Sequence, residues 1–225
     1  GALADYDCRN NRLAQAALRQ DGFEQLVARA RARYGAQRIA LVLGTSTSGI
    51  LETEHAYQQR DPQTGALPAS YRFATTHNLY ASTDFVRRYL GLEGPAAMIS
   101  TACSSSAKVF AAAARMMDAS IVDAAVVGGV DSLCMTTLYG FASLELLSAQ
   151  ICRPWDAQRN GLSLGEAAAF ALLERECTAP QAWLLGAGES SDGHHMSSPH
   201  PEGAGAVQAM RAALSQAQLH PRDVD

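Results

Sequence analysis

The chain has 225 residues, of which 48% are hydrophobic and 18% charged, and its formal net charge is −4. This length is sufficient for a buried core, and this balance excludes a disordered or fibrous protein. A dedicated nucleic-acid-binding protein would carry a basic surplus, so that class is disfavoured. No stretch approaches the ~18 uninterrupted apolar residues of a membrane span, and the start lacks the basic-then-apolar pattern of a signal peptide. We therefore expect no nucleic-acid or membrane contact.

Hydrophobic periodicity predicts helices that alternate with short buried strands. The expected helices cover residues 9–20, 22–34, 78–90, 104–118, roughly 136–147, and 203–218. The expected strands cover residues 38–44, 95–101, 123–129, 166–174 and 181–189. This alternation indicates a layered α/β domain with a mixed, mostly parallel sheet. The two final strands are close enough in sequence to pair directly, so we expect an antiparallel edge.

The five cysteines are scattered along the chain and form no CxxC pair and no Cys/His cluster with metal-ligand spacing. They are Cys8, Cys103, Cys134, Cys152 and Cys177. An odd number of scattered cysteines is typical of free thiols in a reducing compartment, rather than of a disulfide framework or a zinc site. We therefore expect a cytoplasmic protein without a bound metal.

Residues 96–118 have the pattern of a buried strand, a turn and an Ala-rich helix, and Cys103 lies in the turn. A thiol there is close to the free N–H groups of the first helical turn, which favour a thiolate and can hold a developing oxyanion. The small neighbour Ala102 lets a substrate carbonyl approach, as in a nucleophile elbow with sulfur in place of oxygen. The alternative is a small core residue at a strand end, which is common for free cysteine.

Four segments in a fixed order add a family resemblance. They are TACSSSA (101–107), VVGGVDS (126–132), RPWDAQRNGLSLGEAAAFALLE (153–174) and SSDGHHMSSPHPEGAGA (190–206). Together they resemble the β-ketoacyl-acyl-carrier-protein synthases, the condensing enzymes of fatty acid and polyketide synthesis. The resemblance implies a thiolase-like layered α/β/α fold. It also implies that residues 1–225 form an N-terminal-type domain, one half of a duplicated fold, incomplete at both ends.

Residue roles follow from the resemblance where a position matches a family motif. Cys103 corresponds to the nucleophile that takes the acyl group from a carrier-protein phosphopantetheine thioester. Ala102 corresponds to the small residue beside it, and Phe141 corresponds to a position that borders the acyl tunnel. Arg9 and Arg12 lie near the place where relatives hold basic residues that meet the acidic carrier protein.

The implied reaction is a decarboxylating Claisen condensation between a Cys-bound acyl group and malonyl-acyl-carrier-protein, in fatty acid, polyene or polyketide elongation. The resemblance implies no cofactor of the protein's own, since phosphopantetheine arrives on the acyl carrier protein. Residues 95–101 match the strand that meets its mate across the family's two-fold interface. We therefore expect a homodimer, or a heterodimer with a related subunit.

The sequence also departs from the family. The usual RDGF-V-x-GEGA pattern appears as RNGLSLGEAA, with Asn160, Leu162 and Ala167 in place of an acid, an aromatic residue and a glycine. This favours a specialised branch that serves polyene or polyketide chains. The blocks that carry the family's two catalytic histidines are absent, so we expect this polypeptide alone to be inactive. Two alternatives stay open: a non-catalytic subunit like the chain-length factors, and a truncated inactive fragment.

Two other polar segments have ordinary structural interpretations. His194, His195 and His200 lie in a Ser/Pro/Gly loop, and no Cys or carboxylate has ligand spacing with them, so we expect no metal there. By resemblance this loop lies near the pantetheine entrance. The glycines of LGTSTSG (43–49) have neither P-loop nor GxGxxG spacing, so they predict a tight strand-to-helix turn.

Overall fold

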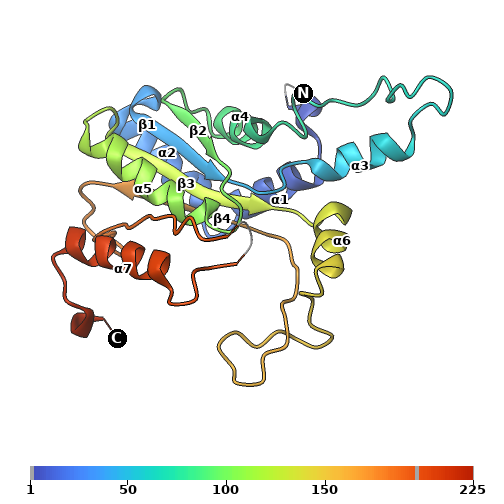
Figure 1. Ribbon diagram of the computed structural model, residues 1–225. Helices are drawn as coiled ribbons and strands as arrows, with labels where there is room; N and C mark the ends of the chain where they lie inside the picture. The colour runs from blue at the N-terminus through green and yellow to red at the C-terminus, as the bar shows by residue number, and fades with distance from the viewer. Residues whose placement is uncertain (1–2, 196–197, 225) are drawn as a thin grey trace.

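The computed structural model describes residues 3–195 and 198–224 (Figure 1). The helices are α1 (Arg9–Leu18), α2 (Phe23–Tyr34), α3 (Ile50–Gln58), α4 (Leu79–Leu90), α5 (Ser105–Asp118), α6 (Met135–Ser143) and α7 (Ala204–Ala217). The strands are β1 (Ile39–Gly44), β2 (Ala96–Ile99), β3 (Ala124–Asp131) and β4 (Ala167–Glu174). Short 3₁₀ turns cover Ala4–Tyr6, Ala36–Arg38 and Pro221–Asp223. Within the described ranges, each helix is too short or too polar to cross a membrane.

The four strands form one sheet in the order β2-β1-β3-β4. Both β2 and β3 run parallel to β1, and β4 runs antiparallel to β3. In this register Val42 lies opposite both Ala97 and Val127, and Val127 lies opposite Ala171. The mixed, mostly parallel sheet with an antiparallel edge is therefore confirmed.

The two faces of the sheet are covered by different helices (Figure 1). Successive residues of a strand point to opposite faces. Leu41 accordingly packs with Leu18 of α1 and Val86 of α4, whereas Val42 packs with Val109 of α5. All five side chains are buried. The result is three layers, with α1, α2 and α4 on one face and α5 on the other.

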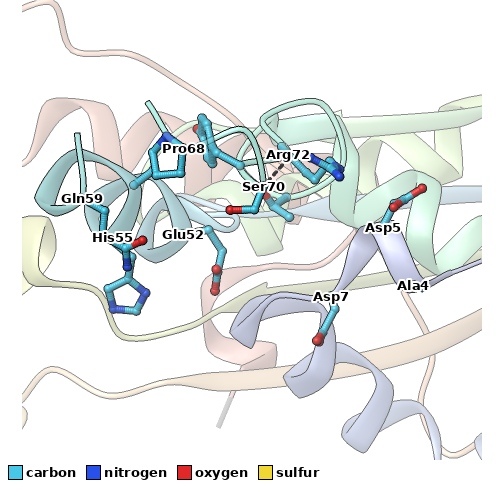
Figure 2. A pocket seen from close by; sticks show the side chains of 12 residues that line it. Ala4, Asp5, Asp7, Glu52, His55, Gln59, Pro68, Ser70 and Arg72 are labelled. Atoms are coloured by element: carbon cyan, nitrogen blue, oxygen red, sulfur yellow. Dashed lines mark hydrogen bonds between the residues drawn. The ribbon is translucent and has the colours of Figure 1, made fainter. Parts of the chain in front are cut away.

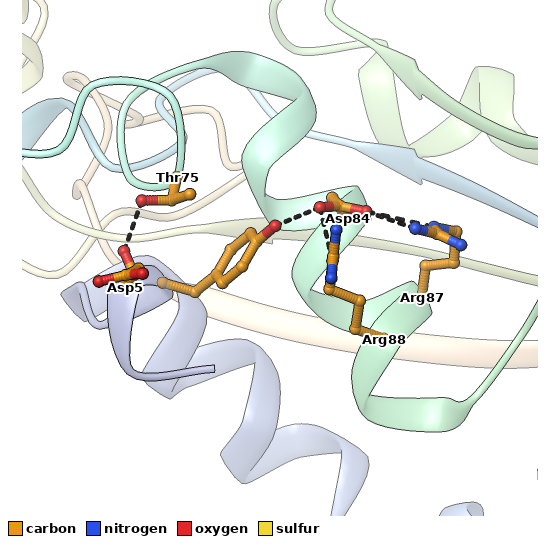
Figure 3. Close-up of polar contacts among 6 residues, drawn as sticks. Asp5, Thr75, Asp84, Arg87 and Arg88 are labelled. Atoms are coloured by element: carbon orange, nitrogen blue, oxygen red, sulfur yellow. Dashed lines mark hydrogen bonds and ion pairs between the residues drawn. The ribbon is translucent and has the colours of Figure 1, made fainter. Parts of the chain in front are cut away.

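An ionic cluster on α4 ties the N-terminal segment to the body of the protein. Asp84 accepts hydrogen bonds from the hydroxyl of Tyr6 and from the guanidinium groups of Arg87 and Arg88 (Figure 3). Burial raises the pKa of Asp84, but these donors outweigh it and leave the pKa below its usual value. The carboxylate is therefore ionised at neutral pH and joins two segments of the chain.

The expected strand over 181–189 is wrong. This segment pairs with no strand among the described residues, and its Gly186 and Gly188 lie against α7 instead. A Cβ atom at Gly188 would lie 1.8 Å from the carbonyl oxygen of Ala209, so the two backbones are in direct contact. An apolar groove of about 690 Å³ lies between β4 and residues 181–184. The antiparallel edge is consequently formed by β3 and β4, not by the last two expected strands.

Helix α3 follows the expected strand-to-helix turn, but its range was not among the expected helices. Its sequence, ILETEHAYQ, has weak hydrophobic periodicity, and only Ala56 is buried in this fully described helix. The chain that follows α3 extends away from the sheet before it returns to α4 (Figure 1). The expected turn after β1 is present and leads into this helix.

Candidate functional site

The parallel strands β1, β2 and β3 all end at one edge of the sheet, where α3 and α6 also begin (Figure 1). Residues 45–49, 100–104 and 132–134 follow these three strands. Ligands of open α/β sheets bind outside the carboxyl ends of the strands. This edge is therefore the candidate site, and Cys103 lies on it.

Cys103 lies between β2 and α5, in the strand–turn–helix arrangement that the sequence predicts. Its side chain is exposed, and Ser104 is the N-cap residue of α5. The preceding Ala102 has a φ of 53°, which is in the left-handed region. A non-glycine residue in that conformation is strained and persists only where the surroundings enforce it. The same kind of strain turns a nucleophile outward at an elbow.

Hydrogen bonds to the carbonyl oxygen of Ala102 enforce this conformation. It accepts from the N–H of Ser105 at 3.1 Å, from Ser105 Oγ at 2.6 Å and from Ser46 Oγ at 3.0 Å. Ser105 Oγ also accepts from the N–H of Thr101 at 2.9 Å. The serines that open α5 are therefore structural parts of the turn, and they hold the backbone on both sides of Cys103.

Two glycines let the start of α5 lie directly on the sheet. A Cβ atom at Gly44 would lie 2.7 Å from the carbonyl carbon of Ser105. A Cβ atom at Gly129 would lie 2.1 Å from Ser106 Oγ. Both distances are far below an ordinary contact, so any side chain at these positions would push the helix start away. The two glycines, at the ends of β1 and β3, thus set how closely α5 approaches the sheet. They thereby position residues 101–104, the turn that carries Cys103, which we call the nucleophile turn.

Asp131, at the end of β3, locks the loop after β1 in place. Its Oδ1 accepts from Thr45 Oγ1 at 2.8 Å and from the N–H groups of Ser46 at 2.7 Å and Thr47 at 2.9 Å. Because Ser46 also reaches Ala102, Asp131 is linked to the turn of Cys103. Neither Asp131 nor Ser46 is among the site residues predicted from the sequence. The available signal was their position, since each lies at or just after the end of a buried strand.

The structure places the other sequence-predicted residues in different surroundings. Ala102 shares the turn with Cys103, whereas Phe141 is half-buried on the separate helix α6. Arg9 forms a two-pronged ion pair with Glu166, which also accepts from the N–H of Leu133 at 3.1 Å. Arg12 pairs with Asp7 near the N-terminus, away from that cluster.

The Arg9 contact has an electrostatic consequence for the start of β4. The guanidinium of Arg9 and the N–H of Leu133 hold the pKa of Glu166 below its usual value. Glu166 belongs to the Gly-Glu pair of the 153–174 motif, so part of that motif serves to fasten β4 to α1 and to the end of β3.

The histidine loop shows polar contacts within itself. The rings of His194 and His200 meet edge to face with centroids 5.0 Å apart, and His195 Nδ1 accepts from the N–H of Ser198 at 3.2 Å. Asp192 accepts from the N–H of His200, which lowers the pKa of Asp192. In the described part of the chain, no three His, Cys, Asp or Glu side chains come together in a way that could hold a metal ion.

The remaining cysteines differ from Cys103 in exposure or in location. Cys8 and Cys134 are buried, and burial raises the pKa of the Cys8 thiol. Cys152 is half-buried, and Cys177 is exposed in the segment after β4. Exposure alone therefore does not single out Cys103. Its distinguishing feature is its place at the first turn of a helix on the carboxyl edge of the sheet.

The single lysine of the chain lies one turn into the same helix. Lys108 pairs with Glu189 at 2.9 Å, and Glu189 also pairs with Arg115 at 3.2 Å. The ammonium group of Lys108 has the largest effect on the pKa of Glu189, and it and the guanidinium group of Arg115 hold that pKa below its usual value. These contacts dock residues 187–192 onto α5, beside a pocket of about 480 Å³ that begins at Ser104.

Two family models match this chain. The model described as "Beta-ketoacyl synthase, N-terminal domain" matches residues 11–179, and "Beta-ketoacyl synthase, C-terminal domain" matches residues 181–225. Among curated proteins, the chain is 32% identical over 198 residues to a 3-oxoacyl-[acyl-carrier-protein] synthase 2 of Vibrio cholerae serotype O1. That match covers 81% of this chain and 47% of the relative, so the chain spans about half the length of the curated relatives it matches.

Solved structures give the same result. One chain of the complex between the ketosynthase ApeO and its chain length factor ApeC from Xenorhabdus doucetiae is 42% identical, with a TM-score of 0.86 over 99% of this chain and 55% of that chain. The ishigamide ketosynthase/chain length factor matches in fold, with 23% identity and a TM-score of 0.86 over 99% of this chain and 56% of that chain. The thiolase-like layered fold is thus confirmed. By its motifs, its fold and the family model that covers most of its length, the chain belongs to the beta-ketoacyl synthase family.

Proposed function

We propose that this chain supplies the nucleophile of a 3-oxoacyl-[acyl-carrier-protein] synthase, which extends an acyl group on Cys103 by decarboxylating condensation with malonyl-acyl-carrier-protein. One observation carries the proposal. The exposed thiol of Cys103 lies at the first turn of α5, directly after a strained Ala102, on the edge of the sheet where ligands bind. Membership in the family and the 42% identity to a chain of a ketosynthase/chain length factor complex support it.

The first half-reaction transfers the acyl group. The thiol of Cys103 gives up its proton, its sulfur attacks the thioester carbonyl, and a new carbon–sulfur bond forms. The bond to the pantetheine sulfur then breaks, and that sulfur leaves with the proton that Cys103 gave up. The helix start beside Cys103 favours the oxyanion of the tetrahedral intermediate. In the second half-reaction malonyl-carrier-protein loses carbon dioxide, and its carbanion attacks the acyl carbon. A carbon–carbon bond forms and the Cys103 thiolate is released. The carrier's phosphopantetheine is the only prosthetic group that this scheme uses.

The partners are part of the proposal. The acyl carrier protein delivers both substrates, and the protein pairs with a related subunit in the cytoplasm. The complex that contains the 42% identical chain joins a ketosynthase to a chain length factor, which favours a heterodimer over a homodimer. Strand β2 is an edge strand of the sheet with half-buried residues, and it is the segment 95–101 that we expect at the interface. The 225 residues alone do not condense, because they lack the two histidine blocks.

Acyl transfer to the full-length protein tests the proposal. The protein is incubated with an acyl-carrier-protein donor and examined by intact mass and peptide mapping. Wild type and Cys177→Ala, which removes the other exposed thiol, should gain one acyl group, whereas Cys103→Ala should gain none. If Cys103 stays unmodified in the wild type, the assignment fails, and the non-catalytic partner subunit becomes the better interpretation.

A further inference from the structure

Helix α6 is held in place in an unusual way. It is described in full and has no buried residue, so core packing does not fix it. Its N-cap residue, Cys134, makes no side-chain cap, and the Cys134 thiol contacts Thr137 Oγ1 instead. The first N–H groups of a helix need partners from outside the helix. Those partners come from a different element.

The carboxylate of Glu54, on α3, caps α6. Its Oε2 accepts from the N–H of Met135 at 2.9 Å, and its Oε1 accepts from the N–H and the Oγ1 of Thr136, both at 2.6 Å. A negative charge at a helix N-terminus is favourable. Burial opposes ionisation, but the donors of Thr136 and Met135 outweigh it and lower the pKa of Glu54. At neutral pH an ionised side chain thus holds α6.

Helix α3 is itself joined to the turn that carries Cys103. It begins directly after residues 45–49, the loop in which Ser46 Oγ donates to the carbonyl of Ala102. Further along α3, Thr53 Oγ1 contacts His77 Nδ1 at 2.6 Å, and it also contacts the hydroxyl of Tyr71. The helix is therefore braced from the segment before α4 on one side, while Glu54 reaches α6 on the other.

We propose that Glu54 is a positioning residue, which fixes α6 relative to the nucleophile turn and so sets which acyl chains reach Cys103. The inference rests on the proposed function, in which Cys103 carries the acyl group, and on the family resemblance, which implies that Phe141 of α6 borders that group. Loss of the Glu54 carboxylate removes the acceptor of the first N–H groups of α6, which Met135 and Thr136 carry. The helix then no longer presents one fixed wall to the acyl chain.

Glu54→Gln tests this with a matched control on the same helix. Glu52→Gln makes the same charge change, but Glu52 faces a separate cavity of about 420 Å³ between α3 and the N-terminal segment (Figure 2). Thr136→Val, at the other end of the contact, removes one donor and keeps the shape. All variants are made in the full-length protein, and thermal unfolding confirms that each is folded.

The first measurement is hydrogen exchange in peptides that contain the first turn of α6. We expect Glu54→Gln to raise exchange at Met135 and Thr136 about fivefold, as for the loss of a helix cap, with Glu52→Gln unchanged. Wild-type exchange in Glu54→Gln would overturn the proposal, because the cap would then not hold the helix.

The second measurement is Cys103 acylation with short-chain and long-chain acyl-carrier-protein donors. We expect the ratio of kcat/KM for the two donors to change about tenfold in Glu54→Gln and less in Thr136→Val, since misplacing a binding wall affects the chains that touch it. An equal loss with both donors, or no change, overturns the proposal. If the wild type takes up no acyl group at all, the proposed function fails instead, which separates the two outcomes.

Discussion

Gly129 and Ser106 are in such close contact that a Cβ atom on the glycine would lie 2.1 Å from the serine Oγ. Gly129 is near the end of β3, and Ser106 is in the first turn of α5. The contact shows that the position of Cys103 depends on the absence of a side chain on a neighbouring strand. It also provides a direct way to disturb the nucleophile turn without touching the thiol.

Gly129→Ala should destabilise the protein by about 1–3 kcal/mol, the usual cost of overpacking. Gly140→Ala is the control, because no described atom lies within 4 Å of a Cβ atom there, and an alanine within α6 should be neutral or stabilising by up to about 1 kcal/mol. Urea unfolding monitored by fluorescence gives both values. Equal midpoints for the two variants would contradict the close approach of α5 to β3.

Asp131→Ala should destabilise the protein by about 2 kcal/mol or more, because it leaves several donors of Thr45, Ser46 and Thr47 without their charged acceptor. It should also slow acylation of Cys103, since Ser46 would no longer support Ala102. Asp156→Ala is the comparison, as Asp156 accepts from the N–H of Gln158 in an exposed turn. A larger loss of stability in Asp156→Ala would refute the assigned role of Asp131.

Low pH should lower the free energy of unfolding, because it protonates Asp84. Its pKa is lower in the folded state than in the unfolded chain, so its stabilising effect is present above the unfolded value of 3.8 and is lost as the pH falls through the lower, folded value. The urea concentration at the unfolding midpoint should therefore fall as the pH is lowered below about 4, and it should fall less in Asp84→Asn. An identical pH profile for wild type and variant would show that the Tyr6 and arginine contacts do not act on Asp84.

Thiol labelling should separate four of the five cysteines into two groups, with the half-buried Cys152 outside both. Iodoacetamide should modify the exposed Cys103 and Cys177 in the native protein, whereas the buried Cys8 and Cys134 should react only after unfolding. Cys8 is further protected because burial raises its thiol pKa and leaves less thiolate. Peptide mapping by mass spectrometry gives the order of reaction. Early labelling of Cys8 would contradict the packing of α1 against the sheet.

Local pattern predicted those elements that bury a regular face. The strand expected at 38–44 is β1 at Ile39–Gly44, and the helix expected at 104–118 is α5 at Ser105–Asp118. The apolar run 181–189 led to a wrong prediction of a strand. A run of apolar residues does not reveal whether a neighbouring strand is available to pair with it. In the structure Trp183 and Leu185 of this run are exposed.

The candidate site was visible in part. Cys103 could be found because its turn, its small neighbours and its helix are adjacent in sequence. Glu54 and Asp131 could not, since their partners lie 81 and 85 positions away, and a local sequence pattern does not reveal such long-range contacts. The extent of helix α3 was missed for a related reason. Its polar residues Thr53 and Glu54 contact the segment before α4 and the start of α6, and such a helix lacks the one-sided apolar pattern of a surface helix.

Lys108 makes the docking of residues 187–192 chemically addressable. Every other cationic side chain except histidine is an arginine, so an amine-selective reagent has one internal target in this chain. That amine is engaged by Glu189 on the segment that follows the 181–184 groove. The yield of a mild acylating tag at Lys108 in the folded protein, compared with the yield in the unfolded protein, would therefore report how often this segment lifts off α5.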